Sequence, residues 1–438
     1  MCEKYKNSLY RLLFLHSLII LGLLTVIVIS GLDYRDLLLR DDGYYRCARQ
    51  FVQGGSLMHR QFGPLLPLLY SPLFIFPTFL HPFLRVFLAL SFSLGTLALL
   101  MHIVKDYITG KQFFRGGLFI ILNPLYNHWI LRSSPEIYLT FLLGLLIFFL
   151  VKYSRSGSFR YFLYAAGVFV TGIFVKPAFL LIPFALLLFA ILTKSKKMAV
   201  AALVFTCTGI GGYALFNRVT AARTNFPGPG QTASPPASRG LKQTYSIYGG
   251  DLFIWNTFLT DYLIKTGQFH KGTLTSYKPR PGAGIYSSGG YFYEIRNKTA
   301  RPWIENYFRR RPGGNYLCMN LYFIYDRPLL VLQKLAVSPL LFFSLSGRTA
   351  ESVLMLFVTL FSLFFALPGI GRALKKPGTK KDILLIVFII AGFSSLYLTT
   401  HAIGRYSVPI LPYLYIWAGV TLSKSPATQP GHAARGSG

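Results

Sequence analysis

The stretch LLFLHSLIILGLLTVIVIS, residues 12–30, decides the fold, because it is a long and almost wholly apolar run in which His16 is the only titratable residue. An apolar run of about 20 residues is long enough to cross the hydrocarbon core of a bilayer as an α-helix. Such runs recur along the 438 residues, 53% of which are hydrophobic and only 13% charged, and the mean hydropathy is +0.47. The sequence therefore predicts an all-α polytopic membrane protein.

About ten apolar segments are expected to span the membrane, within a range of nine to twelve. They lie at residues 12–31, 83–104, 116–131, 136–152, 161–175, 177–193, 198–216, 351–371, 383–401 and 406–422. The first segment follows three basic residues, and no cleavage motif of small residues comes after it. We therefore expect a retained signal anchor rather than a cleaved signal peptide.

Basic residues cluster in alternate connections between these segments. They are Lys105, Lys111, Arg115, Lys152, Arg155, Arg160, Lys194, Lys196, Lys197, Arg372, Lys375, Lys376, Lys380 and Lys381. Because Lys and Arg concentrate in cytoplasmic loops, we expect these connections and both termini in the cytoplasm. The net charge of +31 would also suit a nucleic acid, but the basic residues are spread over many short connections. We expect membrane lipids, and no nucleic acid, as partners.

Two long segments would face outward, residues 32–81 and 217–350. Both belong to a single transmembrane domain of residues 1–424, and residues 425–438 are expected to form a disordered tail. From residue 217 to residue 327 the second segment has 15 Lys and Arg and five Asp and Glu. Long loops translocate whatever their charge, but a basic mouth would also attract an anionic substrate. The sequence leaves both interpretations open.

Asp41 and Asp42 stand out because acids are scarce, with 14 Asp and Glu against 45 Lys and Arg. The pair follows the first apolar segment, where a membrane surface is expected. Asp commonly caps the start of a helix, so an ordinary cap is one interpretation and a functional carboxylate pair is the other. Apolar positions then recur at helical spacing and predict a short amphipathic helix on the outer surface. These positions are Tyr45, Ala48, Phe51 and Val52.

Three more charged residues are expected on the same outer side. Glu136 follows Pro135 in a short turn, where it is either a plain helix start or a functional acid. Lys176 lies in a tight hairpin, and Arg405 opens the last segment. Basic residues at outer helix ends oppose the positive-inside rule, so both are candidates for binding a specific anion. A snorkelling interface residue is the alternative for Lys176.

Several short motifs occur in a fixed order along most of the chain. Asp41-Asp42-Gly43-Tyr44-Tyr45 matches the pattern D-[DE]-x-x-Y, Lys176-Pro177 is a K-P pair, and the last segment reads R-Y-x-x-P-x-x-P from Arg405. Together with Glu136, these motifs resemble the C-type glycosyltransferase (GT-C) superfamily, in particular the family 39-like group of protein mannosyltransferases and aminoarabinose transferases. The chain departs from that pattern at Asp42, where Glu is more frequent, and at Glu136, which is often Asp.

The resemblance implies a GT-C-type fold with two large outer loops that carry short amphipathic helices. It also implies an inverting transfer of a sugar from a polyprenyl-phosphate donor to a hydroxyl of a glycan, glycolipid or protein. The enzyme would lie in a bacterial inner membrane and act on its outer face. The resemblance indicates no definite cofactor, and a divalent metal is compatible with the acidic residues.

The resemblance also suggests roles for individual residues. Asp41 would accept the proton of the acceptor hydroxyl, and Asp42 would orient the acceptor or raise the pKa of Asp41. Glu136 would contact the sugar, the acceptor or a metal. Lys176 and Arg405 would meet the charge that develops on the lipid phosphate. The remaining candidates for substrate binding are Tyr45, His59, Arg60, Arg132, His401 and Tyr406.

Two other classes of protein suit the same sequence. A transporter or flippase of a lipid-linked or anionic substrate would place charged residues along a path near the membrane midplane, commonly between inverted repeats. No repeat relates the two halves of the sequence, and the candidate residues gather on one face. A structural subunit that kept the fold and lost its activity is the third class.

Overall fold

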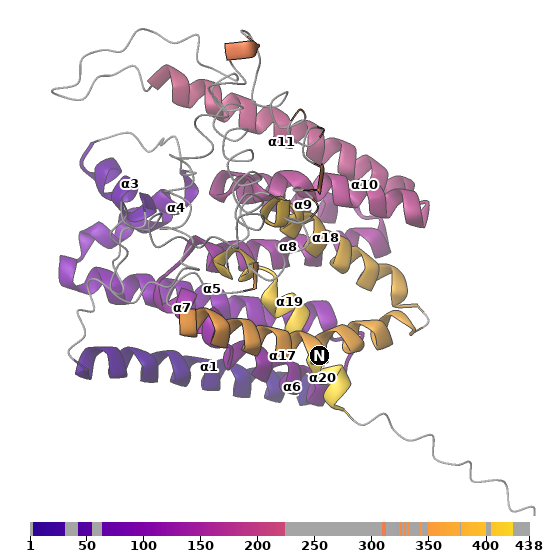
Figure 1. Ribbon diagram of the computed structural model, residues 1–438, viewed down its shortest axis with the longest axis horizontal. Coiled ribbons are helices and arrows are strands. Elements are labelled where there is room, and N and C mark those ends of the chain that lie inside the picture. Colours follow the sequence, from indigo (N-terminus) through magenta and orange to yellow (C-terminus); the bar gives the residue numbers. More distant parts are fainter. Residues whose placement is uncertain are drawn as a thin grey trace, which may run out of the picture.

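The computed structural model describes residues 3–30, 43–54, 64–223, 309–311, 349–376, 378–399 and 404–423, with isolated positions between 322 and 343. All regular structure in these residues is helical, which confirms the expected all-α class. The long helices lie side by side in a bundle and run nearly parallel or antiparallel to one another (Figure 1).

The bundle is built from helices of different lengths. They are α1 (Glu3–Ile29), α5 (His81–Val104), α6 (Gly110–Ile121), α7 (Pro124–Leu131), α8 (Pro135–Ser156), α9 (Phe159–Val175), α10 (Ile182–Thr193), α11 (Lys196–Arg223), α17 (Thr349–Leu374), α18 (Lys380–Thr399), α19 (Leu411–Tyr415) and α20 (Ala418–Leu422). Two further short helices and four 3₁₀ turns complete the described structure. They are α3 (Gly43–Val52), α4 (Leu65–Tyr70), η1 (Ser71–Ile75), η2 (Thr78–Leu80), η3 (Pro177–Leu181) and η6 (Gly404–Ser407).

Four helical stretches within the described residues are long and apolar enough to cross a membrane. They are Glu3–Ile29, Thr78–Val104, Pro135–Ser156 and Leu354–Leu374. Their apolar side chains also cover the outside of the bundle; Phe14, Ile29, Phe357 and Phe364 are all exposed. An apolar exterior of this kind suits a lipid environment. The larger number of spans expected from the sequence stays a prediction.

Four of the expected segments differ from the helices of the structure. The segment 177–193 is divided into η3 and α10, and the segment 406–422 into η6, α19 and α20. α1 begins at Glu3, so the basic residues before the first apolar run belong to the helix itself. The expected segment 116–131 is broken into α6 and α7. The break has a local cause: the Asn123 side chain accepts a hydrogen bond from the Tyr126 amide (2.9 Å), and Pro124 takes the first position of α7. Asn before Pro is a strong helix start, and it ends the preceding helix.

The short helix expected after the acidic pair is confirmed as α3. Its buried face differs from the expected one, because Tyr44, Cys47 and Ala48 are buried whereas Val52 is 50% exposed. α3 packs against α4 and η1. Its buried residues Cys47 and Ala48 follow Tyr44 by three and four positions in the sequence, so all three lie on the same face of the helix.

Glycine lets the last helices approach their neighbours closely. α20 packs between α6 and α17. A side chain at Gly419 would overlap the carbonyl oxygen of Gln112, and a side chain at Gly369 would overlap that of Trp417. α8 has a different setting: it packs against α5, α9 and α18, and nearly every apolar residue along it is buried or half-buried.

The two ends of the bundle carry different residues. We call one the α3 end; it holds α3, α4, the α7–α8 turn, the α9–η3 turn and η6. The other, the Arg155 end, holds the start of α1, the α5–α6 loop, the end of α8 and the α17–α18 loop, joined by Tyr5 to Lys105 O (3.0 Å) and Lys376 to Tyr107 O (2.9 Å). The ends lie about 30 Å apart, since α8 has 22 residues. Figure 1 shows α3 and α4 at the left and the α17–α18 loop at the right.

Candidate functional site

An ion pair joins two helix ends at the α3 end of the bundle. Glu136 lies in the first turn of α8, and Lys176 caps the last turn of α9, where its amide donates to Gly172 O (2.8 Å). The Lys176 ammonium is 2.5 Å from Glu136 Oε1. A carboxylate suits a helix N-terminus and a cation suits a helix C-terminus, so the two dipoles favour this pair.

The two members of the pair differ in burial. The Glu136 side chain is 2% exposed, whereas that of Lys176 is 17% exposed. The second carboxylate oxygen of Glu136 accepts a hydrogen bond from the Ser134 hydroxyl. A buried carboxylate needs such partners, because an unpaired buried charge costs several kcal/mol, on the order of 3–5. Glu136 is therefore fixed inside the bundle, and Lys176 forms the side of the pair that a ligand can approach.

Two tyrosines complete the surroundings of Lys176. Its ammonium lies 4.1 Å from the ring centroid of Tyr406 in η6 and 5.8 Å from that of Tyr397 in α18. The two rings stack, with centroids 4.3 Å apart and planes at 15°. An ammonium over an aromatic face is attracted by the ring quadrupole, so both tyrosines help to hold Lys176 in place. The sequence predicts no role for Tyr397, which is one of three aromatic residues in the apolar helix α18.

α3 contacts the same turn directly. The Tyr44 hydroxyl donates to Val175 O at 3.4 Å, one residue before Lys176. Gly43, the first residue of α3, comes directly after Asp42 in the sequence. The helix that follows the acidic motif is thus in contact with the hairpin that carries the candidate phosphate-binding lysine.

A second polar group lies beside the first and contains Arg85. The Arg85 side chain belongs to α5 and is 1% exposed, and its guanidinium carbon lies 5.0 Å from the ring centroid of Tyr45 and 5.1 Å from that of Tyr70. The Tyr45 hydroxyl donates to Nδ1 of His81 (2.6 Å), whose Nε2 donates to Phe76 O (2.9 Å). Sequence reasoning missed Arg85, although a charged residue within an apolar segment is a signal of function or of a buried partner.

The α7–α8 turn connects the two groups. Ser133 has a φ of 47°, a left-handed conformation that is uncommon for residues other than glycine. Three hydrogen bonds hold it there: its carbonyl accepts from Tyr70 (2.8 Å), and its hydroxyl donates to Arg85 O (2.9 Å) and contacts the Tyr138 hydroxyl (3.0 Å). This fixed turn sets the position of Ser134 and Glu136, the next residues along the chain.

The structure brings together three of the predicted site residues, Glu136, Lys176 and Tyr406. Tyr45 lies in the neighbouring group around Arg85. Arg132 caps α7, with its guanidinium carbon 5.7 Å from the ring centroid of Trp129. For Arg405 the structure describes the backbone alone, within η6. The other candidates lie outside the described residues, so their roles stay predictions: Asp41, Asp42, His59, Arg60 and His401.

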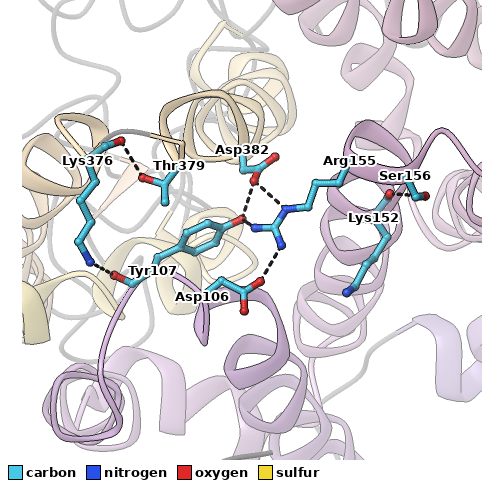
Figure 2. Close-up of polar contacts among 8 residues, drawn as sticks. All are labelled: Asp106, Tyr107, Lys152, Arg155, Ser156, Lys376, Thr379 and Asp382. Atoms are coloured by element: carbon cyan, nitrogen blue, oxygen red, sulfur yellow. Dashed lines mark hydrogen bonds and ion pairs between the residues drawn. The ribbon is translucent and has the colours of Figure 1, made fainter.

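A third polar cluster occupies the Arg155 end (Figure 2). The guanidinium of Arg155 donates from Nε to Asp382 (2.8 Å) and from the other two nitrogens to Asp106 and to the Tyr107 hydroxyl, both at 2.6 Å. The Tyr107 hydroxyl donates in turn to Asp382 (3.1 Å). Burial, and after it the charge of Asp382, raises the pKa of Tyr107, which keeps this hydroxyl protonated as a donor. Every nitrogen of the guanidinium is used, as expected of a structural clamp.

The carboxylates of Glu136, Asp106 and Asp382 each bind a basic side chain. No group of three His, Cys, Asp or Glu side chains within the described residues is placed to hold a metal ion. Glu136 uses its two oxygens for Lys176 and Ser134. Because Asp41 and Asp42 lie outside the described ranges, a metal held by the acidic motif stays a prediction.

Comparisons with known proteins were made for the whole chain. No protein-family model matches it, and no curated protein matches its sequence.

Proposed function

We propose that this chain is a membrane glycosyltransferase of GT-C type that transfers a sugar from a polyprenyl-phosphate donor to an acceptor hydroxyl. One observation carries the proposal. Lys176, a partly exposed ammonium, lies between a buried carboxylate and two stacked tyrosines, and it lies in a hairpin that contacts the helix directly following the acidic motif. This arrangement supports an anion-binding centre beside a pair of carboxylates.

The sidedness of the bundle supports an outer location for this centre. The loop residues Lys105 and Lys376 lie at the Arg155 end, together with the N-terminal turn of α1. By the positive-inside rule this end faces the cytoplasm, so the α3 end faces outward. We propose about ten spans in a bacterial inner membrane, with both termini inside and the acceptor, a glycan, glycolipid or protein, supplied from outside.

The proposed reaction is a single displacement at the anomeric carbon of the donor sugar. The acceptor hydroxyl attacks that carbon, and the bond from carbon to phosphate oxygen breaks, with its electron pair leaving on the phosphate. Asp41 accepts the hydroxyl proton, and Asp42 orients the acceptor. Lys176 and Arg405 stabilise the charge that grows on the leaving phosphate. Attack from the opposite face inverts the anomeric configuration.

Comparing the lipids and glycans of cells with and without the protein tests the proposal. Mass spectrometry is expected to show one glycoconjugate that loses a sugar when the protein is absent and regains it when the protein is restored. No change in any glycoconjugate would count against a transferase.

Replacement of Asp41 by Asn tests the base. Asp41→Asn is expected to abolish the sugar transfer while the protein remains folded in the membrane, because the amide cannot accept the proton. Asp36→Asn is the matched control, since it removes the same charge from the same segment of the sequence. Normal transfer by Asp41→Asn would refute the base assignment.

A lipid-substrate transporter is the second candidate, and one observation favours it. His16 is fully buried near the middle of α1, with Nε2 2.9 Å from the hydroxyl of Ser93, which in turn donates to Tyr126 (3.0 Å). Ionisable residues inside spanning helices often mark a transport path. Movement of a fluorescent polyprenyl phosphate across proteoliposomes, with no sugar transfer by the same protein, would favour the transporter.

A further inference from the structure

The ammonium of Lys176 has a fixed counter-charge in Glu136. The carboxylate is held by Ser134 on its second oxygen and is buried, so it cannot easily move aside for a ligand. The lysine is the more exposed member of the pair. Its position is restrained by the rings of Tyr406 and Tyr397. An anion that reaches Lys176 therefore joins Glu136 at the ammonium and does not replace it.

The geometry of a shared ammonium determines what the anion experiences. Two oxygens that accept from the same ammonium, each at hydrogen-bond distance, lie about 4–5 Å apart. An anion oxygen bound to Lys176 lies about 3 Å from the ammonium and about 4–5 Å from the Glu136 oxygen, so the repulsion by Glu136 offsets more than half of the attraction by Lys176. A second negative charge on the same anion increases both effects, and more than half of the added attraction is cancelled.

Sugar transfer changes the charge of the lipid phosphate, and this step rests on the proposed function. The donor is a phosphodiester with one negative charge. When the sugar leaves, the electron pair of the broken bond stays on the phosphate and the acceptor proton goes to the base. The product is a phosphate monoester, which carries about −1.5 to −2 at pH 7. An isolated lysine would bind this product more tightly than the donor.

We infer that Glu136 is a positioning residue that keeps Lys176 from retaining the product, polyprenyl phosphate. It acts through the lysine and does not touch the reacting atoms. With Glu136 ionised, more than half of the attraction between Lys176 and a phosphate is offset, so the extra charge of the product adds less affinity than it would at a lone lysine. Without Glu136, that charge would strengthen product binding and slow its release.

Binding measurements on the purified full chain test this inference. The probes are farnesyl phosphate, which is close to doubly charged at pH 8, and farnesyl methyl phosphate, which has one negative charge at the same pH. The wild type is expected to bind the two probes with similar dissociation constants. Glu136→Gln is expected to favour the doubly charged probe by on the order of tenfold, because one repulsive charge at close range is removed.

Two further variants serve as controls. Lys176→Gln is expected to weaken the binding of both probes, because it removes the attracting charge. Asp106→Asn removes a carboxylate from the ion pair with Arg155 at the opposite end of α8, and it should keep the wild-type preference. Farnesol, which lacks the phosphate, corrects for the contribution of the lipid chain.

The outcomes separate the inference from the function on which it rests. A folded Glu136→Gln protein with the wild-type preference would overturn the inference and leave the transferase proposal standing. Failure of the folded wild type to bind either phosphate would overturn both. Should Glu136→Gln fail to fold, Glu136→Asp replaces it, because the shorter side chain keeps the buried charge but moves it away from the ammonium. A folded Glu136→Asp protein should shift its preference toward the doubly charged probe, and an unchanged preference would overturn the inference.

Discussion

α8 carries an ion pair at each end, and the two pairs differ in how completely their donors are used. At the Arg155 end all three guanidinium nitrogens meet an oxygen, from Asp382, Asp106 and Tyr107. At the α3 end an ammonium has three N–H donors, and in the described part of the chain only one of them meets an oxygen, that of Glu136. Counted as N–H groups, Arg155 uses three of five and Lys176 one of three. Among the described residues Arg155 also faces two carboxylates, whereas Lys176 faces one. The excess negative charge around Arg155 disfavours an anion and indicates a structural role, whereas the single counter-charge of Lys176 and its unused N–H groups indicate a binding role.

Removing Lys176 should have the largest effect, because it leaves the buried Glu136 carboxylate without its counter-charge. Lys176→Met is expected to lower the free energy of unfolding by about 3–5 kcal/mol. The double variant Lys176→Met with Glu136→Gln should recover most of this loss, since no charge remains buried. Denaturant unfolding in mixed micelles measures the free energy of unfolding of the wild type, the single variant and the double variant. Equal losses in the single and double variants would show that the pair is not coupled.

Arg155→Met tests the cluster at the Arg155 end in the same way. We expect a loss of about 2–3 kcal/mol in the free energy of unfolding, smaller than a fully buried pair would give because Arg155 and Asp106 are partly exposed. Binding of farnesyl phosphate by the remaining folded protein should be unchanged, because the site is about 30 Å away along α8. A change in that binding would mean that the two ends of α8 are coupled, which contradicts a purely structural role.

The sequence could predict the features of the fold and site that depend on residues close together in the chain. Apolar runs predicted helical structure in each expected segment, although three of the segments are divided into shorter helices or turns. The charge of the connections predicted that Lys176 and Glu136 lie together, at the end of the bundle opposite Lys105 and Lys376. The break before α7 could also have been predicted, because Asn123 and Pro124 are a strong helix start.

The contacts themselves depend on tertiary packing and could not be predicted. Lys176 and Glu136 are 40 residues apart, and Arg155 and Asp382 are 227 apart. The sequence identifies Arg155 only as one of the basic residues in the connections, although Arg155 is the centre of a polar cluster in the structure. Tyr397 has no signal in a helix rich in apolar residues, since only the packing of α18 against η6 brings it to Tyr406.

Tyr397 offers a smaller test of how the α3 end restrains its cation. Tyr397→Leu removes one of the stacked rings and should cost about 0.5–1 kcal/mol in farnesyl phosphate affinity, because Lys176 loses part of its restraint. Tyr397→Phe keeps the ring face and should retain affinity close to that of the wild type. If the two variants lose affinity equally, the hydroxyl group and not the ring face is what matters.

Asp106→Asn should have the smallest effect of these variants, and it tests the exposed contact of Arg155 at the Arg155 end. Asp106 is 44% exposed, and its partner Arg155 keeps Asp382 and Tyr107 as acceptors. Exposed ion pairs contribute little, so the loss in the free energy of unfolding should be about 0–1 kcal/mol. Comparison with Arg155→Met then separates the buried contact with Asp382 from the exposed one. A loss as large as that of Arg155→Met would mean that the contact with Asp106, and not the one with Asp382, supplies most of the stabilisation. The solvent exposure of Asp106 would then not predict how much its ion pair contributes.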